Sequence, residues 1–207
     1  MPAVTLWIDP ALPEQAFSRS KIVLASGGVI AYPTDTYYGL GADPGNRRAV
    51  QRLFAIKGRR PDQPILLLIA DPGDAATWAA EIPPRATELM KRYWPGPLTI
   101  VLKARPNVLT ELSAGTGTIG LRVPGSDMTR QLLRFLGHGL TGTSANPSGR
   151  PSPRTARETA EAVGGAIDLI LDGGETAGGK PSTVIDASGQ ALRLIREGAI
   201  PSKDIMV

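Results

Sequence analysis

The chain has no cysteine among its 207 residues and a single histidine, His138. The missing cysteines exclude disulfides, thiol nucleophiles and cysteine-ligated zinc or iron–sulfur sites. One histidine is too few for a multi-histidine metal centre, and a serine–histidine triad would depend entirely on His138. Any catalysis must therefore use lysine, arginine, carboxylate or hydroxyl groups, backbone amides, or a metal that arrives with a ligand.

Long apolar runs are also missing. No stretch approaches the ~20 apolar residues that a membrane-spanning helix needs, and the N-terminus has no basic segment followed by an apolar one. We therefore expect a cytoplasmic protein that is neither exported nor bound to a membrane. The lack of cysteine is consistent with a reducing compartment.

The composition favours one folded domain with anionic partners. The formal net charge is +4 and the sequence pI about 9.6, which favours nucleotides or RNA as ligands. Hydrophobic residues make up 42% of the chain, and the 24 glycines and 19 prolines are dispersed between apolar runs, as expected for frequent sharp turns. This length predicts a single domain over residues 1–207.

The spacing of apolar residues predicts alternating helices and strands. Helices are expected over residues 13–26, 46–57, 85–93, 127–136 and 155–163, with Asn46 as an N-cap and Gly58 as a helix end. Strands are expected over residues 29–32, 65–70, 98–102, 119–123, 140–143, 169–171, 183–186 and 192–195. The run 65–70 is typical of a strand buried on both faces. The last two strands are expected to form a hairpin. Together these elements predict an α/β domain with a mixed sheet.

A threonine-rich segment, residues 33–41, follows the expected strand 29–32. Ligands of α/β sheets bind outside the carboxyl ends of strands, so the hydroxyls of Thr34 and Thr36 are candidate ligand contacts. Its glycines would let the backbone approach a ligand. The alternative is a hydroxyl-capped turn that leads into the next helix.

A basic cluster, Lys57-Gly58-Arg59, ends the expected helix 46–57 and precedes the Pro61–Pro64 segment, which is expected to form a rigid entry to the sheet. Arginine makes forked contacts with phosphate or carboxylate, and lysine acts as a point charge. The alternative is a solvated basic helix end, because cations are favourable at a helix C-terminus in any case.

A hydroxyl and amide cluster, Ser144-Ala145-Asn146, follows the expected strand 140–143. It lacks a G-x-S-x-G elbow, and His138 is the only histidine that could serve as a base, so binding is favoured over nucleophilic catalysis. A capped turn is the alternative.

Two further cations, Arg122 and Arg196, lie within or just after expected strands. Charged side chains are rarely buried without a partner. Each arginine is therefore expected on the surface, in a structural ion pair, or beside Lys57 and Arg59 in one cationic hollow.

The glycine-rich segment 174–180, GETAGGK, resembles a phosphate-binding loop. That motif requires serine or threonine directly after the lysine and then a helix, whereas here Pro181 and an expected strand follow. We therefore exclude a Walker-type NTPase. A loop that borders a site is still expected, with Ser182 as a hydroxyl donor.

Seven segments, taken in order, resemble the YrdC-type threonylcarbamoyl-AMP synthase family. They are YPTDTYYGLG (32–41), KGR (57–59), WPGPLT (94–99), LRVP (121–124), TSANPSG (143–149), PSTVID (181–186) and IREG (195–198). The ordered set covers residues 29–198 and is specific to the family. The chain departs from the family pattern at Arg60, which precedes Pro61, at Gln63, where asparagine is common, and at Leu68, where longer members have histidine.

The resemblance implies a twisted, open mixed α/β sheet with flanking helices and a cationic concave face. It implies a nucleotidyltransferase that makes threonylcarbamoyl-AMP and pyrophosphate from L-threonine, bicarbonate and ATP. Magnesium would come with the ATP, and no protein side chain would hold a metal. The product would pass to a threonylcarbamoyl-transferase complex that makes threonylcarbamoyladenosine in tRNA.

The resemblance also implies roles for individual residues. The catalytic tetrad around the phosphates and the carbamate would be Lys57, Arg59, Ser144 and Asn146. The residues implied to contact L-threonine are Thr34, Thr36, Arg122 (on the carboxylate) and Ser182. Those implied to contact the nucleotide are Lys57, Arg59, Thr118, Ser144, Asn146, Ser152 and Arg196. The clusters at 57–59 and 144–146 are then expected to form opposite walls of one nucleotide site.

Two other functions remain open. A noncatalytic RNA-binding module would use the same basic face, although no aromatic platform accompanies its cations. A related enzyme would adenylate another carbamoyl or acyl acceptor.

Overall fold

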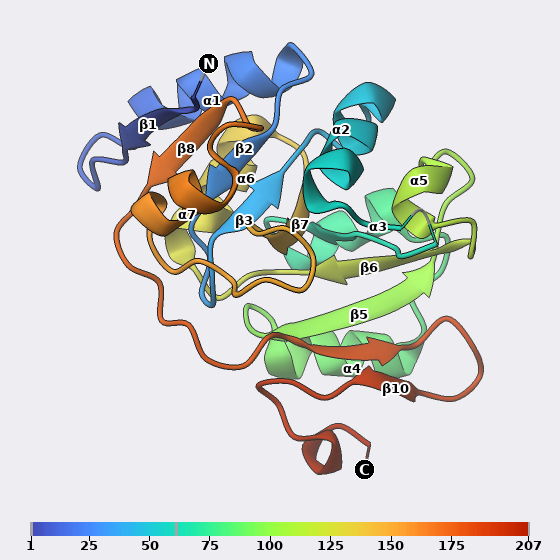
Figure 1. Ribbon diagram of the computed structural model, residues 1–207. Helices are drawn as coiled ribbons and strands as arrows, with labels where there is room; N and C mark the ends of the chain where they lie inside the picture. Colours follow the sequence, from blue (N-terminus) through green and yellow to red (C-terminus); the bar gives the residue numbers. More distant parts are fainter. Residues whose placement is uncertain (1, 61, 207) are drawn as a thin grey trace.

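The computed structural model describes residues 2–60 and 62–206, and in these residues the strands form one ten-stranded sheet (Figure 1). The strands are β1 (Val4–Trp7), β2 (Ile30–Tyr32), β3 (Gly39–Gly41), β4 (Leu66–Leu68), β5 (Leu98–Lys103), β6 (Thr118–Arg122), β7 (Leu140–Ser144), β8 (Leu169–Asp172), β9 (Thr183–Asp186) and β10 (Arg193–Arg196). The helices are α1 (Glu14–Ala25), α2 (Arg47–Lys57), α3 (Ala75–Trp78), α4 (Pro84–Tyr93), α5 (Thr110–Ser113), α6 (Asp127–Leu136) and α7 (Ala156–Val163). Two 3-10 turns cover Pro72–Asp74 and Ser202–Asp204.

The sheet is mixed, with the strand order β1-β8-β2-β3-β7-β4-β6-β5-β9-β10. It contains parallel pairs, such as β4 with β6, and antiparallel pairs, such as β5 with β6. The last two strands, β9 and β10, pair as the expected antiparallel hairpin. The expected α/β fold with an open mixed sheet and flanking helices is confirmed.

Helices cover both faces of the half of the sheet formed by β1, β8, β2 and β3 (Figure 1). On one face, α1 and α6 pack against β2 and β8 in a cluster that includes Phe17, Leu133 and Leu171. On the other face, α2 and α7 pack against β2 and β3 around Leu40 and Leu53. This double cover makes that half of the molecule a closed core.

The other half of the sheet, β4, β6, β5, β9 and β10, is covered on one face only. Side chains alternate along a strand, so β5 buries Ile100 against the helices while Thr99 and Val101 point to the opposite face. Residues on that opposite face line a pocket, and Lys57 at the end of α2 is the helical residue among them. The uncovered half-sheet therefore forms the floor of an open cavity.

Helix α2 has the boundaries that its end signals predict. The Asn46 side chain accepts a hydrogen bond from the backbone N–H of Ala49 at 3.1 Å, and Gly58 ends the helix in the left-handed conformation, with φ +56°. These ends place Lys57 on the last turn and turn the chain so that Arg59 follows it into the pocket.

The segment 33–41 does not lead directly into the next helix, which the alternative of a hydroxyl-capped turn implied. Its last residues form β3, which pairs antiparallel with β2 and β7. At Gly41 a Cβ atom would lie 2.7 Å from the Tyr32 ring, so this glycine serves sheet packing and not the approach of a ligand. Two glycines in three residues hide the strand from a propensity-based prediction.

Other elements also depart from the predicted pattern. Strand β4 is shorter than 65–70 and is not buried on both faces, because Leu66 faces the pocket and is partly exposed. Strand β1 was not predicted; it lies at the sheet edge, and Val4 and Trp7 are more than half exposed. The four-residue helices α3 and α5 are too short to give a helical pattern. Pro61, part of the expected rigid entry to the sheet, lies outside the described residues.

Across the residues that the structure covers, no helix is long enough and apolar enough to pass through a membrane.

Replacing Gly58 by alanine tests the helix end. A Cβ there would meet no atom within 4 Å, so the cost is the left-handed backbone alone, about 1 to 2 kcal/mol of unfolding free energy. Gly58→Asn is the matched control and should cost less, because asparagine tolerates this conformation. Chemical denaturation measures both, and an alanine variant as stable as the wild type would contradict the prediction.

Candidate active site

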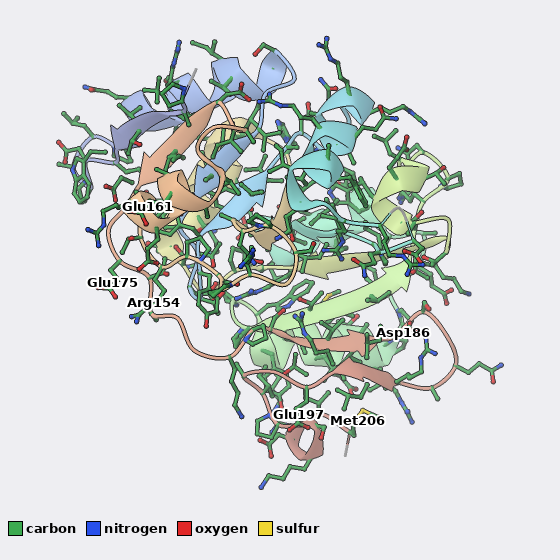
Figure 2. All side chains as sticks on the ribbon, viewed as in Figure 1. Arg154, Glu161, Glu175, Asp186, Glu197 and Met206 are labelled. Carbon is green, nitrogen blue, oxygen red and sulfur yellow. The ribbon has the colours of Figure 1, made fainter. Side chains whose placement is uncertain are left out.

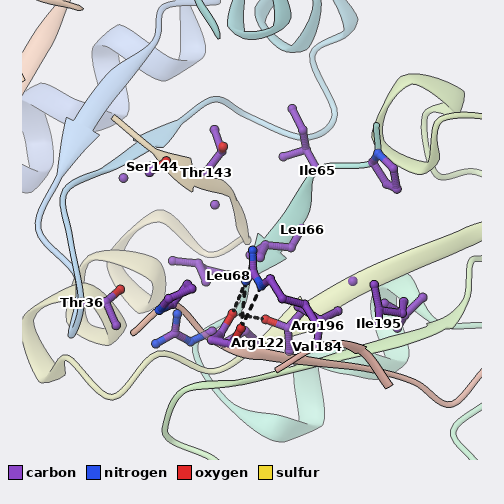
Figure 3. Close-up of a pocket in the computed structure, with 18 of the residues that line it drawn as sticks. Thr36, Ile65, Leu66, Leu68, Arg122, Thr143, Ser144, Val184, Ile195 and Arg196 are labelled. Atoms are coloured by element: carbon purple, nitrogen blue, oxygen red, sulfur yellow. Dashed lines mark hydrogen bonds between the residues drawn. The ribbon is translucent and has the colours of Figure 1, made fainter. Parts of the chain in front are cut away.

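The open face of the half-sheet carries a pocket of about 1000 Å³ (Figure 3). Every residue for which the sequence predicts a binding or catalytic role lines it. These residues are Thr34, Thr36, Lys57, Arg59, Thr118, Arg122, Ser144, Asn146, Ser152, Ser182 and Arg196. The fold thus brings together positions from the whole length of the chain.

The basic cluster and the hydroxyl and amide cluster are adjacent and not opposite each other. Lys57 Nζ donates hydrogen bonds to the backbone oxygens of Ser144 at 2.6 Å and Asn146 at 2.5 Å. Their side-chain oxygens lie 3.3 Å from the same nitrogen. The two clusters therefore meet at one site, as expected, but they are not its opposite walls, since hydrogen bonds join Lys57 directly to Ser144 and Asn146.

Asn146 extends this junction into the loop that follows β7. Its Nδ2 donates to the backbone oxygens of Pro147 (3.0 Å) and Arg150, while the backbone N–H of Ser148 donates to the Lys57 carbonyl at 2.9 Å. Lys57 and Asn146 are 3% and 4% exposed. The polar groups of both residues are thus used to hold the loop that carries Ser152 at the pocket wall.

Arg59 and Arg196 contact only neutral groups among the described residues. Arg59 donates to the backbone oxygens of Gln63 and Pro64, at 3.1 and 2.6 Å. Arg196 donates through Nε and Nη2 to the backbone oxygen of Ser182, at 3.2 and 2.8 Å. Both guanidinium groups are held in place, but their positive charge is not neutralised by these contacts.

The cations of the pocket also repel one another. Burial and, secondarily, the charge of Arg59 lower the pKa of Lys57 to about 8. Burial lowers the pKa of Arg59, with a smaller effect from Arg196, and burial lowers the pKa of Arg196, with a smaller effect from Arg122. An anion bound among these groups would relieve both the desolvation and the repulsion.

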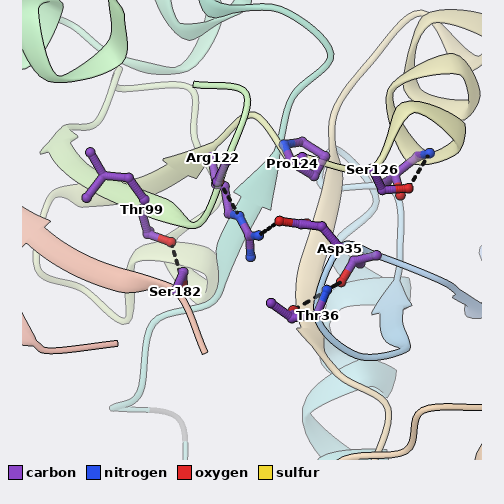
Figure 4. Close-up of polar contacts among 12 residues, drawn as sticks. Asp35, Thr36, Thr99, Arg122, Pro124, Ser126 and Ser182 are labelled. Atoms are coloured by element: carbon purple, nitrogen blue, oxygen red, sulfur yellow. Dashed lines mark hydrogen bonds and ion pairs between the residues drawn. The ribbon is translucent and has the colours of Figure 1, made fainter. Parts of the chain in front are cut away.

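Arg122 differs because it meets a carboxylate. Its Nη2 lies 2.5 Å from Asp35 Oδ2, and its Nε donates to the Gly96 carbonyl at 2.9 Å (Figure 4). Among the described residues, the only other pocket-lining cation in an ion pair is Arg193, which pairs with Asp186 at the pocket rim and is 74% exposed.

Two residues at the site were not singled out by the sequence. Asp35 pairs with Arg122, and Thr99, which is 1% exposed, shares a 2.9 Å hydrogen bond between its hydroxyl and that of Ser182 (Figure 4). Both lie inside the segments YPTDTYYGLG and WPGPLT that carry the family resemblance. The motifs mark the neighbourhood, but only the fold shows which residues in them touch.

The threonine hydroxyls of the segment 33–41 make hydrogen bonds within a local turn, and Thr34 and Thr36 also line the pocket. Thr34 Oγ1 donates to the Tyr37 carbonyl at 2.7 Å and accepts from the Thr36 backbone N–H at 3.2 Å. The Thr34 hydroxyl is therefore largely committed to the turn. The Thr36 hydroxyl lies 3.2 Å from that of Thr34.

The glycine-rich segment 174–180 crosses beside this turn. Gly178 N–H donates to the Thr36 carbonyl at 2.7 Å, and the Tyr37 hydroxyl donates to the Gly179 carbonyl at 2.6 Å. The segment is also held by the ion pair of Arg154 with Glu175, which lie near each other in Figure 2. It then continues into β9 and not into a helix, in agreement with the exclusion of a Walker-type loop.

The described residues offer little to a metal ion. They contain no grouping of three or more histidine, cysteine, aspartate or glutamate side chains that could hold one. Among the pocket-lining residues Asp186 is the carboxylate, and it already bonds Ser188 and Arg193.

The chain is similar to proteins named threonylcarbamoyl-AMP synthase. A model of the Sua5/YciO/YrdC family, described as telomere recombination, matches residues 22–198. Threonylcarbamoyl-AMP synthase of Pyrococcus abyssi is 40% identical over 182 residues, which are 88% of this chain and 54% of that protein. The Nitrosococcus oceani protein of the same name is 37% identical over 186 residues, which are 88% of this chain and 100% of that protein.

Solved structures share the fold along nearly the whole chain. The crystal structure of Pyrococcus abyssi Sua5 complexed with L-threonine superposes with a TM-score of 0.93 at 36% identity, covering 98% of this chain and 60% of that one. Escherichia coli YciO superposes with a TM-score of 0.88 at 28% identity, covering 99% of this chain and 100% of that one.

The chain spans about half the length of the Pyrococcus abyssi protein (54%) and of a second relative, threonylcarbamoyl-AMP synthase of Bacillus subtilis (55%), to which it is 37% identical. The family model nevertheless covers most of the chain, and it includes each of the residues that line the pocket. On this evidence the chain belongs to the Sua5/YciO/YrdC family.

Proposed function

We propose that the chain is an L-threonylcarbamoyladenylate synthase. The amine of L-threonine and bicarbonate give a carbamate and water. A carbamate oxygen then attacks the α-phosphate of ATP, forming a new P–O bond, and the bond from the α-phosphate to the departing pyrophosphate breaks. The products are threonylcarbamoyl-AMP and pyrophosphate.

One observation carries this proposal: five cations line a single pocket, and three of them, Lys57, Arg59 and Arg196, meet no carboxylate among the described residues. A triphosphate is a polyanion, and Arg59 and Arg196 present unneutralised charge to it. Arginine binds phosphate through paired N–H donors. Arg122 is left for the carboxylate of threonine, with Thr36 and Ser182 beside it in the pocket.

The reaction needs positioning and charge stabilisation more than a protein nucleophile. Negative charge gathers at the α-phosphate as pyrophosphate leaves, and fixed cations stabilise it without reorganising. In this proposal Arg59 contacts the phosphates directly. Lys57 contributes its charge and, with Asn146, holds the loop that presents the Ser144 hydroxyl.

Magnesium is proposed to enter with ATP. Asp186 is engaged by Arg193 and Ser188, so the phosphate oxygens and water would supply the ligands of the ion.

The product is an activated mixed anhydride, so a transferase must consume it. We assign that role to a threonylcarbamoyl-transferase complex acting on tRNA, with bicarbonate as the carbon source and the cytoplasm as the location. The net charge of +4 is compatible with some affinity for RNA.

The first test is the dependence of pyrophosphate release on all three substrates. With ATP and bicarbonate present, we expect release only when L-threonine is added, because the attacking carbamate forms on its amine. A coupled pyrophosphate assay measures this, with L-serine as the comparison. Release that is unchanged without threonine would contradict the synthase, and release with another amino acid alone would indicate a related enzyme. Tight, salt-dependent RNA binding without turnover would indicate an RNA-binding module.

A pair of neighbouring arginines gives a matched test within that assay. Arg59→Ala should lower turnover by roughly 100-fold or more, the usual loss when one donor to a developing charge is removed. Arg60→Ala should retain wild-type turnover, because its side chain is 77% exposed and pairs with Asp62. Equal activity of the two variants would remove Arg59 from the mechanism.

The pKa of Lys57 predicts how ATP affinity depends on pH. If ATP binds when Lys57 is charged, a pKa of about 8 leaves roughly one tenth of that form at pH 9, so affinity should fall about tenfold from pH 7 to pH 9. Calorimetric titration of ATP without threonine measures this. Lys57→Arg keeps the charge over this range and should remove the fall. A wild-type affinity that does not change with pH would exclude this role for the Lys57 charge.

A further inference from the structure

Arg122 is held by segments from three parts of the chain. It stands on β6, its Nε bonds the carbonyl of Gly96 between α4 and β5, and its Nη2 bonds Asp35 between β2 and β3 (Figure 4). No partner of the remaining nitrogen, Nη1, occurs among the described residues, and Arg122 lines the pocket. Two of its three nitrogens are therefore fixed by the protein, and one is left for a ligand.

The buried carboxylate of Asp35 is not explained by a contribution to the stability of the fold. Its Oδ2 pairs with Arg122, but its Oδ1 is buried and has no hydrogen-bond partner among the described residues. A buried acceptor without a partner costs stability, and a buried ion pair is often no more stable than neutral groups of the same shape. The position of this carboxylate is better explained by what it does to Arg122.

Gly125 leaves the space that the Asp35 carboxylate occupies. A Cβ on Gly125 would lie 2.9 Å from Asp35 Oδ2 and 3.2 Å from its Cγ. Oδ2 is the same oxygen that holds Arg122. Gly125 is not among the residues with positive φ, so an added methyl group would strain no backbone and would instead push the carboxylate aside.

We propose that Asp35 is a positioning residue that aims the Arg122 guanidinium at the carboxylate of the amino-acid substrate, and that Gly125 keeps the place of Asp35 open. The identity of that ligand rests on the proposed function. Asp35 also partly neutralises Arg122, so the phosphate chain is drawn to Arg59 and Arg196, which meet only neutral groups in the part of the chain that the structure describes. Arg122 is thereby reserved for a single carboxylate.

Two variants separate the orientation of the Arg122 guanidinium from the effect of the Asp35 charge. Asp35→Asn removes the negative charge but keeps the shape of the side chain. Gly125→Ala keeps the charge and displaces Oδ2. Loss of the Asp35 charge alone would leave Arg122 more positive and would strengthen its binding of an anion. Weaker threonine binding in both variants would therefore show that the orientation of the guanidinium affects binding more than the charge of Asp35 does. Gly165→Ala is the matched control, because a Cβ there meets nothing within 4 Å.

The experiment combines calorimetric titration of L-threonine and of ATP with crystal structures of the variants. We expect at least tenfold weaker threonine binding in Asp35→Asn and Gly125→Ala, less than twofold change in ATP affinity, a displaced Arg122 guanidinium, and wild-type values for Gly165→Ala. Threonine affinity that stays unchanged or rises in either variant would overturn the positioning role, as would an equal loss of ATP affinity.

The positioning role and the proposed function fail in different ways. If the wild type binds ATP but no threonine, the proposed substrate is wrong. The placement of the Arg122 guanidinium in Gly125→Ala then decides the positioning role by itself: a displaced group supports it and an unmoved group overturns it.

Discussion

The structure of the site depends on one buried ammonium group. Lys57 Nζ lies at the end of α2 and is surrounded by oxygens of Ser144 and Asn146. An ammonium removed from water is unfavourable by several kcal/mol unless its donors are satisfied, so this arrangement persists only if the loop after β7 supplies its carbonyls at that point. The ammonium thus fixes the corner where α2, β7 and the 144–152 loop meet.

That corner determines the electrostatics of the pocket. With Lys57 fixed, Arg59 follows it onto the open face, and Arg196 reaches the same space from β10. Neutral carbonyl groups orient these arginines without cancelling their charge. Among the described residues, no carboxylate neutralises Arg59 or Arg196, which is the form of preorganisation that an anionic substrate and a developing negative charge require.

The sequence predicts the helical ends and strand ends of this site well because local signals determine them. Asn46 and Gly58 define α2 through capping and a left-handed residue, and the apolar runs locate β5 and β6. The family resemblance then identifies eleven of the residues that line the pocket. By contrast, β3 could not be recognised from propensity, because Gly41 is there to accommodate the Tyr32 ring from a neighbouring strand. Contacts between distant segments are likewise absent from local patterns, so the sequence indicates neither the hydrogen bonds of Lys57 to Ser144 nor the pairing of Asp35 with Arg122.

The central claim is that this uncovered half-sheet binds a nucleotide and an amino acid side by side. A crystal structure of the protein soaked with a nonhydrolysable ATP analogue and L-threonine tests it most directly. The account predicts phosphates against Arg59 and the Ser144 hydroxyl, and the threonine carboxylate on Arg122. Ligands bound on another face, or phosphates seated on Arg122 in place of the carboxylate, would contradict it.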